Sequence, residues 1–314
     1  MTDTFDVAGE FAPAENLAVS ATSVDTAPEA VEQDAVAVDV PNGFVELGLA
    51  PALVQAVADL GYTQPTAVQQ KAIPMAMADT GSENGGKFVD LMVSSQTGSG
   101  KTAAFLLPVL HTLIQQQAAA AERERAEFEQ ACADAAAKGE PLPKRAKQKD
   151  PTKAGNFKAA TPGALVLCPT RELAQQVAHD AIELVKHCRG LRIANVVGGM
   201  PYQLQIAKLQ NADLVVATPG RLLDLQRSMQ IKLDQVQFLV VDEADRMLDL
   251  GFADDLAEVN QLTIGRKQTM MFSATFAPRI QQLAARVMRE PQRISIASPD
   301  RKSTRLNSSH GYIS

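Results

Sequence analysis

Residues 95–102, with the letters SQTGSGKT, form a glycine-rich turn between a strand-like run and a helix-like run. We predict the strand at residues 88–93 and the helix at residues 102–114. Such a turn points backbone N–H groups inward at a helix N-terminus, where a phosphate group can bind. Gly98 and Gly100 let the backbone curl, which residues with side chains resist. The segment therefore predicts a phosphate-binding loop, and it restricts the chain to folds in which strands alternate with helices.

Short apolar runs alternate with helical patterns along most of the chain. A helix is predicted at about residues 172–187, and further strands are predicted at residues 164–168, 192–197, 213–217, 237–241 and 269–272. Several of these strands end at a turn or at a helix start. This alternation is typical of a parallel sheet with helices on both faces, so the predicted fold class is α/β. The length of 314 residues allows about two domains of ordinary size.

The formal net charge of −6 is unevenly distributed along the chain. Residues 1–40 contain nine acidic residues and no Lys or Arg, so residues 41–314 carry a net charge of +3. The first segment has no periodic apolar face and predicts a disordered acidic arm, with an intramolecular or partner contact as the alternative. The remainder is close to neutral, so any phosphate-binding surface has to be local.

Composition also bears on the compartment. No run approaches 18 consecutive apolar residues, and the first basic residue is Lys71, so we expect neither a spanning helix nor a secretory signal. Cys132, Cys168 and Cys188 have neither an even count nor CxxC spacing, which argues against a disulfide framework and a zinc ribbon. We therefore expect a cytoplasmic protein without a membrane partner.

Residues 115–160 interrupt the alternation of strands and helices. The stretch 115–138 is polar, Ala-rich and helix-forming, and a coil rich in Pro and Lys follows it. Residues 138–158 contain seven basic and two acidic residues. We interpret the whole as a solvated surface insertion, and an auxiliary basic contact for a polyanion is the alternative.

The last fifteen residues, 300–314, have a different character. The letters DRKSTRLNSSH resemble the translation of a widely used sequencing adapter. We therefore expect residues 300–314 to be a processing scar and the natural chain to be interrupted near Pro299. A natural tail rich in Ser and Arg is the alternative.

An apolar strand ends in Asp242 and Glu243, about 140 residues after the phosphate loop. In the loop, Lys101 would neutralise the terminal phosphates, and the Thr102 hydroxyl could bind Mg²⁺. Asp242 would hold the Mg²⁺ through its water shell, and Glu243 would orient or activate the attacking water. A strand-end acidic pair at this spacing indicates nucleotide hydrolysis.

The letters at residues 242–245 are DEAD, and here the chain resembles the DEAD-box RNA helicases. The other similar segments are GYTQPTAVQ at 61–69 with Phe44 upstream, PTRELA at 169–174, Gly198-Gly199, TPGRL at 218–222, and Ser273-Ala274-Thr275. They agree with the family in identity, order and spacing over about residues 44–299. Val68 and Ser95 stand where the family usually has Ile and Ala.

The resemblance implies that Gln69 reads adenine and that Phe44 stacks on the base. A primary carboxamide donates and accepts together, which matches adenine N6 and N7, whereas guanine presents two acceptors. An aromatic ring can stack on the base face. The implied ATP-binding residues are Phe44, Gln69, Thr97, Gly98, Ser99, Gly100, Lys101 and Thr102. The implied catalytic residues are Lys101, Asp242 and Glu243.

The resemblance also implies a track for the RNA backbone. Its members are hydroxyl-bearing or small residues that approach phosphate oxygens closely, together with arginines that add charge. They are Pro169, Thr170, Arg171, Gly199, Thr218, Pro219, Gly220 and Arg221. Contacts of this kind make RNA binding largely independent of sequence. We expect Glu172 to orient Arg171, and Asp245, Ser273 and Thr275 to couple hydrolysis to strand separation.

We therefore expect the first RecA-like lobe of a bacterial-type, DEAD-box ATP-dependent RNA helicase, with ATP, Mg²⁺ and RNA as ligands. In this family a second lobe closes over the γ-phosphate and supplies an arginine finger, and no such lobe is visible here. One alternative is a DNA-translocating helicase of the same superfamily, which would show other letters at 242–245. Another is a binding-only module, against which Lys101, Asp242 and Glu243 argue.

Overall fold

The computed structural model describes residues 42–77, 87–96, 98–139, 141 and 158–296. The acidic arm at 1–40, the tail at 300–314 and most of the basic stretch at 138–158 lie outside these ranges, so the expectations for them stay predictions. None of the helices in the described ranges combines the length and apolar character that crossing a bilayer requires.

Seven parallel strands of the described chain form one sheet, in the order β3-β4-β2-β5-β6-β1-β7. They are β1 Leu91–Ser94, β2 Ala164–Leu167, β3 Ile193–Val196, β4 Leu214–Ala217, β5 Phe238–Val241, β6 Gln268–Ser273 and β7 Gln292–Ser295. The predicted parallel α/β sheet is confirmed. The sequence did not predict β7, because Ile294 is its only buried residue and the edge strand carries little hydrophobic pattern.

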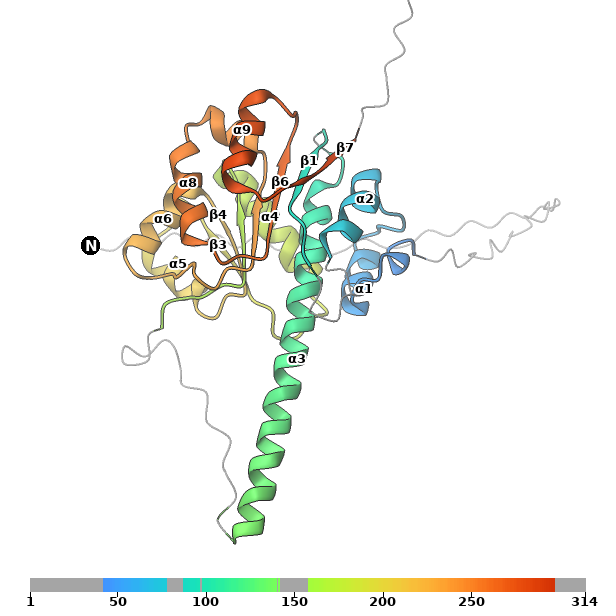
Figure 1. Ribbon diagram of the computed structural model, residues 1–314, viewed down its shortest axis with the longest axis vertical. Coiled ribbons are helices and arrows are strands. Elements are labelled where there is room, and N and C mark those ends of the chain that lie inside the picture. Colours follow the sequence, from blue (N-terminus) through green and yellow to red (C-terminus); the bar gives the residue numbers. More distant parts are fainter. Residues whose placement is uncertain (1–41, 78–86, 97, 140, 142–157, 297–314) are drawn as a thin grey trace, which may run out of the picture. The chain divides into compact units, whose positions relative to one another are not determined.

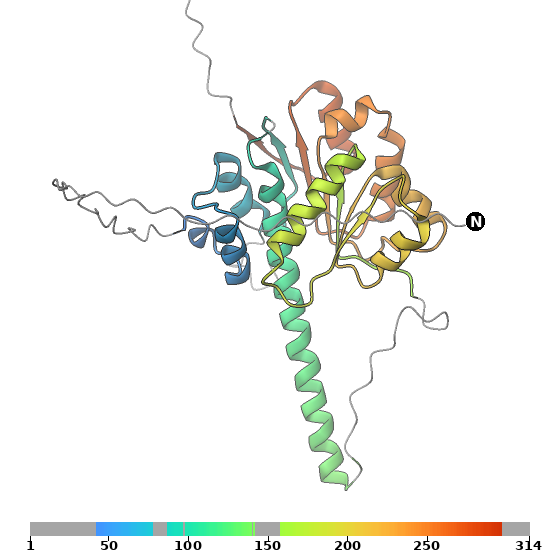
Figure 2. The same cartoon turned by 180° about the vertical axis from the view of Figure 1, so that it is seen from behind.

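Side chains alternate along each strand between two apolar cores, as the twofold period of a strand requires. On β1, Leu91 and Val93 belong to one core and Met92 to the other. Figure 1 shows α8 and α9 in front of the sheet, and Figure 2 shows α4 on the opposite face. The first core is covered by α1 Pro51–Asp59, α2 Ala67–Ala76, α3 Lys101–Lys138 and α4 Arg171–Leu184, and the second by α5 Tyr202–Leu209, α6 Pro219–Arg227, α7 Ala244–Asp249, α8 Ala253–Leu262 and α9 Pro278–Val287.

Helix α3 is longer than the sequence predicts. The expected helix at 102–114 and the helix-forming stretch at 115–138 are one continuous helix that extends past the sheet (Figure 1). No Gly or Pro occurs between residues 109 and 138, and Ala, Gln and Glu are strong helix formers. Gly139 then ends the helix with a φ of 67°. The residues up to Leu113 are largely buried, whereas most of those after Ala118 are exposed.

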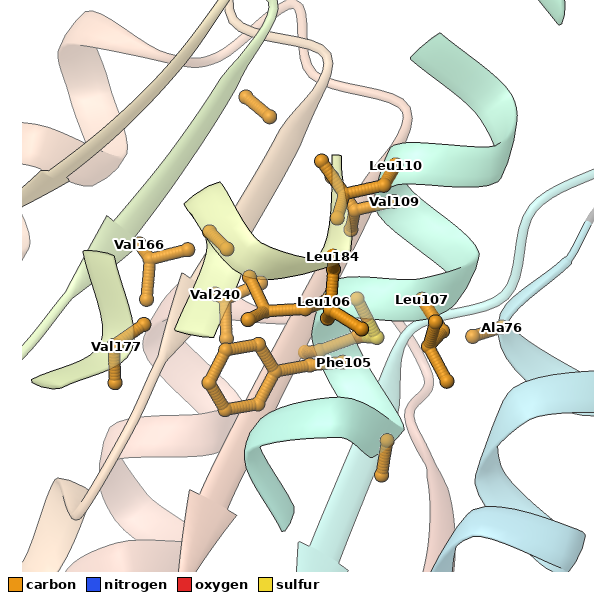
Figure 3. Close-up of a cluster of buried hydrophobic side chains, with 14 of the residues drawn as sticks. Ala76, Phe105, Leu106, Leu107, Val109, Leu110, Val166, Val177, Leu184 and Val240 are labelled. Carbon is orange, nitrogen blue, oxygen red and sulfur yellow. The ribbon is translucent and has the colours of Figure 1, made fainter. Parts of the chain in front are cut away.

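The first half of α3 is apolar around most of its circumference, because the sheet, α2 and α4 all contact it. Figure 3 shows Leu106 directed toward Val240 of β5, and Leu107 directed toward Ala76 of α2. The ring of Phe105 packs edge-on against Phe272 of β6, with the ring centroids 5.2 Å apart. Packing on three sides fixes the position of the helix start, where the phosphate loop ends.

We expect Leu106→Ala to lower the free energy of unfolding by about 2–5 kcal/mol, because the truncation leaves a cavity in a fully buried site. The matched control is Glu124→Ala on the exposed half of the same helix, which should change stability by less than about 0.5 kcal/mol. Urea denaturation of the two variants checks this. Equal losses in both would contradict the distinction between the two halves of α3.

Candidate functional site

The sequence-predicted residues gather along one edge of the sheet, where the parallel strands have their carboxyl ends. The phosphate loop follows β1, Asp242 follows β5 and Ser273 ends β6. Pro169 lies just beyond β2, Thr218 directly follows β4, and Gly198 and Gly199 lie just beyond β3. The strand order places β5, β6 and β1 side by side in one half of the sheet, and β3, β4 and β2 side by side in the other. Ligands of open α/β sheets bind at this edge.

The phosphate loop has the backbone that its glycines predict. Gly98 and Gly100 have φ values of 76° and 86°, in the left-handed region that favours glycine. The Oγ atoms of Ser95 and Ser99 lie 3.0 Å apart, and Lys101 Nζ donates to the Ser95 carbonyl at 3.2 Å. The loop therefore closes on itself and holds Lys101 over its own backbone. Thr97 lies outside the described residues.

Gln69 connects α2 to the phosphate loop. Its Oε1 accepts a hydrogen bond from the Thr66 backbone N–H at 2.9 Å, and its Nε2 donates to the Gly100 carbonyl at 3.1 Å. A Cβ atom on Gly100 would lie 2.5 Å from Gln69 Nε2, so Gly100 allows this close approach. A carboxamide has two hydrogens and two lone pairs, and one of each is left for a ligand.

Phe44 does not lie where a base could stack on it. Its side chain is 1% exposed and belongs to the first core. Tyr62, in the loop that leads to Thr66, is 55% exposed. The sequence analysis did not select Tyr62, although an aromatic residue between Gly61 and a helix N-cap was a usable signal. In this structure Phe44 therefore packs inside the core, and the aromatic residue with an exposed ring in the segment that leads to Gln69 is Tyr62.

Asp242 is a buried carboxylate opposite the phosphate loop. It is 3% exposed, and its Oδ1 accepts a hydrogen bond from the Glu243 backbone at 2.9 Å. Burial raises the pKa of Asp242 to about 6, although the charge of Lys101 opposes this shift. Among contacts within the described residues, its second oxygen makes none, so it can accept from metal-bound water. Asp242 and Lys101 are therefore brought together as predicted.

Glu243 has an unusual backbone conformation for a residue with a side chain. Its φ is 47°, in the left-handed region that is sparsely populated outside glycine. Its carboxylate forms a long ion pair with Arg246, with 3.8 Å between the charged atoms. Strain of this kind persists where the surrounding structure fixes it, and it gathers at functional sites. Asp245 lies near enough for its charge to raise the pKa of Asp242.

The end of β6 contacts the phosphate loop directly. The Ser95 backbone donates to the Ser273 carbonyl at 3.2 Å, and Ser94 Oγ donates to the Ala274 carbonyl at 3.0 Å. Ser273 Oγ is buried and finds no hydrogen-bond partner in the described chain. Thr275 is exposed. Of the predicted coupling residues, Ser273 thus adjoins the loop and has unused hydrogen-bonding capacity.

In the other half of the edge, the segments at 169–174 and 198–199 meet. Thr170 is the N-cap of α4, and its hydroxyl accepts from the Leu173 backbone at 3.3 Å. Arg171 lies against Gly199, where a Cβ atom would be 2.5 Å from Arg171 Nη1. Gly199 also has a φ of 80°. The expected pairing of Glu172 with Arg171 is present at 3.5 Å.

The start of α6 completes this half. Thr218 is its N-cap, Pro219 is its first residue, and a Cβ atom at Gly220 would meet nothing within 4 Å. The backbone at Gly220 is therefore open to close approach. The Arg221 guanidinium lies over the ring of Tyr202, 5.8 Å from the ring centre. The eight predicted residues of this half thus surround the ends of three adjacent strands.

In the described ranges, no three His, Cys, Asp or Glu side chains gather as a metal-binding cluster. This fits the predicted mode of Mg²⁺ binding, which usually involves one or two protein ligands together with phosphates and waters. Asp242 directly follows β5, and Thr102 lies in the first turn of α3, which starts where the phosphate loop ends.

Comparison with known proteins identifies relatives of the whole described region. A profile of the DEAD/DEAH box helicase family matches residues 66–283. The chain is 40% identical over 256 residues to DEAD-box ATP-dependent RNA helicase 52A of Oryza sativa. This match covers 79% of the chain and 36% of the rice protein. It is 36% identical over 266 residues to the ATP-dependent RNA helicase SrmB of Escherichia coli, covering 84% of this chain and 49% of that one.

Solved structures agree with the sequence relatives. A DEAD box protein from Methanococcus jannaschii is 29% identical, with a TM-score of 0.59 over 81% of this chain and 55% of that one. A hypothetical ATP-dependent RNA helicase from Sulfolobus tokodaii is 30% identical, with a TM-score of 0.56. The match covers 78% of this chain and 56% of that one. The chain spans between about a third and a half of the length of the curated relatives described above. Since the family profile matches residues 66–283, which is more than half of this chain, the chain belongs to the DEAD/DEAH box helicase family.

Proposed function

We propose that this chain is the ATP-binding lobe of an ATP-dependent RNA helicase. The observation that carries the proposal is the division of one sheet edge into two adjoining sites. The half formed by β5, β6 and β1 has the chemistry of a nucleotide site, and the half formed by β3, β4 and β2 has that of a phosphate-backbone track. The two relatives compared in sequence are named as ATP-dependent RNA helicases, which supports the same assignment.

In the nucleotide half, each residue has a separate task. The loop backbone and Lys101 would bind the phosphates, and Asp242 and Thr102 would hold Mg²⁺, which would supply positive charge to neutralise the transferred phosphoryl group. Glu243 orients the attacking water and accepts its proton. A helicase structure from Saccharomyces cerevisiae, 26% identical to this chain, is described as containing ADP, which supports an adenine nucleotide here.

The buried carboxylate supports the assignment of a cation. Burial removes the water that would otherwise stabilise the ionised carboxylate, which is why the pKa of Asp242 is raised to about 6. Lys101 offsets only part of this cost. A divalent cation beside Asp242 would favour the ionised form, so the site is better suited to metal-bound nucleotide than to an empty state.

For the base, we propose Gln69 with Tyr62. The spare hydrogen and lone pair of the Gln69 amide can pair with adenine N6 and N7. The exposed ring of Tyr62 offers the stacking face that Phe44 lacks. Because Gln69 also donates a hydrogen bond to the Gly100 carbonyl, this one side chain would connect the bound base to the phosphate loop.

In the RNA half, Thr170, Gly199, Thr218 and Gly220 would approach phosphate oxygens, and Arg171 and Arg221 would add charge. The two halves meet where β2 pairs with β5: the Asp242 backbone donates to the Leu167 carbonyl at 2.9 Å, two residues before Pro169. Asp245, Ser273 and Thr275 would transmit the nucleotide state across this boundary.

Strand separation requires more than this lobe. A second RecA-like lobe would close over the γ-phosphate and grip the same RNA, and the share of the relatives that this chain spans leaves room for it. We therefore propose that residues 41–299 bind nucleotide and RNA but need that lobe for hydrolysis and unwinding. We also propose a cytoplasmic location, because the three cysteines have neither the even count nor the spacing of a disulfide framework.

The proposal is tested by titrating labelled single-stranded RNA and DNA of one sequence with the chain, in the presence of Mg²⁺ and a non-hydrolysable ATP analogue. Tighter binding of RNA supports the RNA helicase. Equal binding of DNA would favour a DNA-translocating helicase, and binding of neither nucleotide nor nucleic acid would contradict the proposal.

Lys101→Ala should weaken ATP binding by about 10- to 100-fold, because a hydrogen bond to a charged phosphate is worth about 1.5–3 kcal/mol. Calorimetry measures the affinity. The control is Lys232→Ala, which removes the same charge from an exposed position outside the site and should leave ATP binding unchanged. Unchanged affinity in Lys101→Ala would exclude this loop as the phosphate site.

Tyr62→Ala should weaken adenine nucleotides, because stacking on an aromatic side chain is worth about 1–3 kcal/mol. Gln69→Ala should also narrow the difference in affinity between ATP and GTP. Tyr62→Phe keeps the ring and is the matched control. Fluorescent-nucleotide titration distinguishes these cases, and full affinity in Tyr62→Ala would show that another residue stacks on the base.

Asp242→Asn should raise the stability of the ligand-free chain in a pH-dependent way. The raised pKa means that Asp242 stabilises the fold while protonated, and that this contribution is lost as the pH rises through about 6. The variant should therefore gain on the order of 2–3 kcal/mol over wild type at pH 8 and little at pH 4. Denaturation at both pH values, with exposed Asp234→Asn as the control, measures it. A gain independent of pH would contradict the burial argument.

A further inference from the structure

Helix α5 contains a side chain that is fully buried yet only half satisfied. Gln205 is 0% exposed, and its Nε2 donates a hydrogen bond of 2.5 Å to the Val197 carbonyl. Its Oε1 is buried and has no hydrogen-bond partner within the described part of the chain. Burying a polar atom without a partner is costly. An apolar side chain of similar size would avoid that cost at Oε1 but would leave the Val197 carbonyl without its donor, so fold stability by itself favours neither side chain.

The bond that Gln205 does make is placed at the RNA half of the sheet edge. Val197 lies one residue beyond β3 and directly before Gly198 and Gly199. The hydrogen bond holds the backbone at the point where the chain leaves the sheet and turns into this glycine pair. Gly199 in turn lies against Arg171, as its close approach to Nη1 shows. Gln205 thus acts on the position of the loop and, through the loop, on Arg171.

A second contact of α5 reaches the other segment of the same half. Tyr202, the first residue of α5, carries the Arg221 guanidinium over its ring. Its hydroxyl also contacts Ser228 Oγ, just after α6. One helix therefore supports both the loop at Gly198 and Gly199 and the arginine of the TPGR segment, although α5 itself contributes none of the eight predicted RNA-contact residues.

We propose that Gln205 is a positioning residue for RNA binding: its hydrogen bond to the Val197 carbonyl sets the Gly198–Gly199 backbone against Arg171 in the geometry that receives an RNA phosphate. The inference rests on the proposed function of this half. Gln205 touches no RNA itself. It acts by fixing the loop before RNA arrives, so that less ordering has to accompany binding.

The variant Gln205→Leu tests this. In wild type the buried oxygen without a partner is Gln205 Oε1, and in the variant it is the Val197 carbonyl oxygen. Because one such oxygen replaces the other, the melting temperature should change little. RNA affinity should fall about three- to tenfold, as expected for one lost hydrogen bond, while ATP affinity is unchanged. The matched control is Gln203→Leu, the same substitution at an exposed position two residues earlier in α5. It should bind RNA as wild type does.

A pH profile separates positioning from packing. In Gln205→Glu the new carboxyl is buried, so its pKa should be raised, and in its protonated form it can donate to the Val197 carbonyl. Within the described residues, the polar group that contacts the Gln205 side chain is the Val197 carbonyl, and Arg171 lies beyond the loop against Gly199. RNA affinity of Gln205→Glu relative to wild type should therefore recover as the pH falls from 8 to 6. Gln205→Leu should show no recovery, and Gln203→Glu corrects for the added charge.

Amide hydrogen exchange at Gly198 and Gly199 gives a readout that needs no RNA. Exchange should be faster in Gln205→Leu than in wild type and unchanged in Gln203→Leu. If exchange stays at the wild-type rate, or if Gln205→Leu binds RNA as tightly as wild type does, the positioning role is wrong. If exchange accelerates but the wild-type chain itself binds no RNA, the proposed function fails, and the assignment to RNA binding is overturned with it.

Discussion

The packing of the first half of α3 is the interaction on which the rest of the site depends. Because α3 starts directly after the phosphate loop, the position of the helix determines the position of the loop. The sheet, α2 and α4 pack against the helix on three sides and fix that position. Gln69 adds a hydrogen bond from α2 to the last glycine of the loop, and β6 adds two more contacts at its start. The loop can be rich in glycine, and still be fixed, because its neighbours supply the rigidity that its own residues lack.

The sheet order explains how two binding chemistries share one edge. β6 separates β1 from β5, which leaves room for phosphates and metal between the loop and Asp242. β2 lies directly beside β5. Asp242 of the nucleotide half and Pro169 of the RNA half therefore follow adjacent strands. A shift of β5 against β2 would move Asp242 relative to Pro169. Communication between the sites therefore needs no long chain of contacts.

The strands and the placement of the site residues at their ends were predicted correctly where a run of apolar residues is followed directly by residues with distinctive chemistry. β2, β4 and β5 are runs of buried apolar residues, and the segments that follow them, at 169–171, 218–221 and 242–243, contain the predicted site residues. The prediction failed where burial depends on distant neighbours. Phe44 resembles a ligand-stacking aromatic residue until packing places it in the core, and nothing local distinguishes Gln205 from the exposed Gln203. The stretch 115–138 was expected to form a helix, but its continuity with the helix at 102–114 was missed because a change of composition was taken as a boundary between elements.

The direction of α3 has a practical consequence. A helix that follows a strand runs back along the sheet, so the exposed part of α3 from about residue 119 to Lys138 extends beyond the amino-terminal edge, opposite both ligand sites (Figure 1). Twenty helical residues span about 30 Å. A fluorophore or a fused reporter domain on this rod would therefore stand clear of nucleotide and RNA while sharing the rigid-body motion of the loop from which the helix starts.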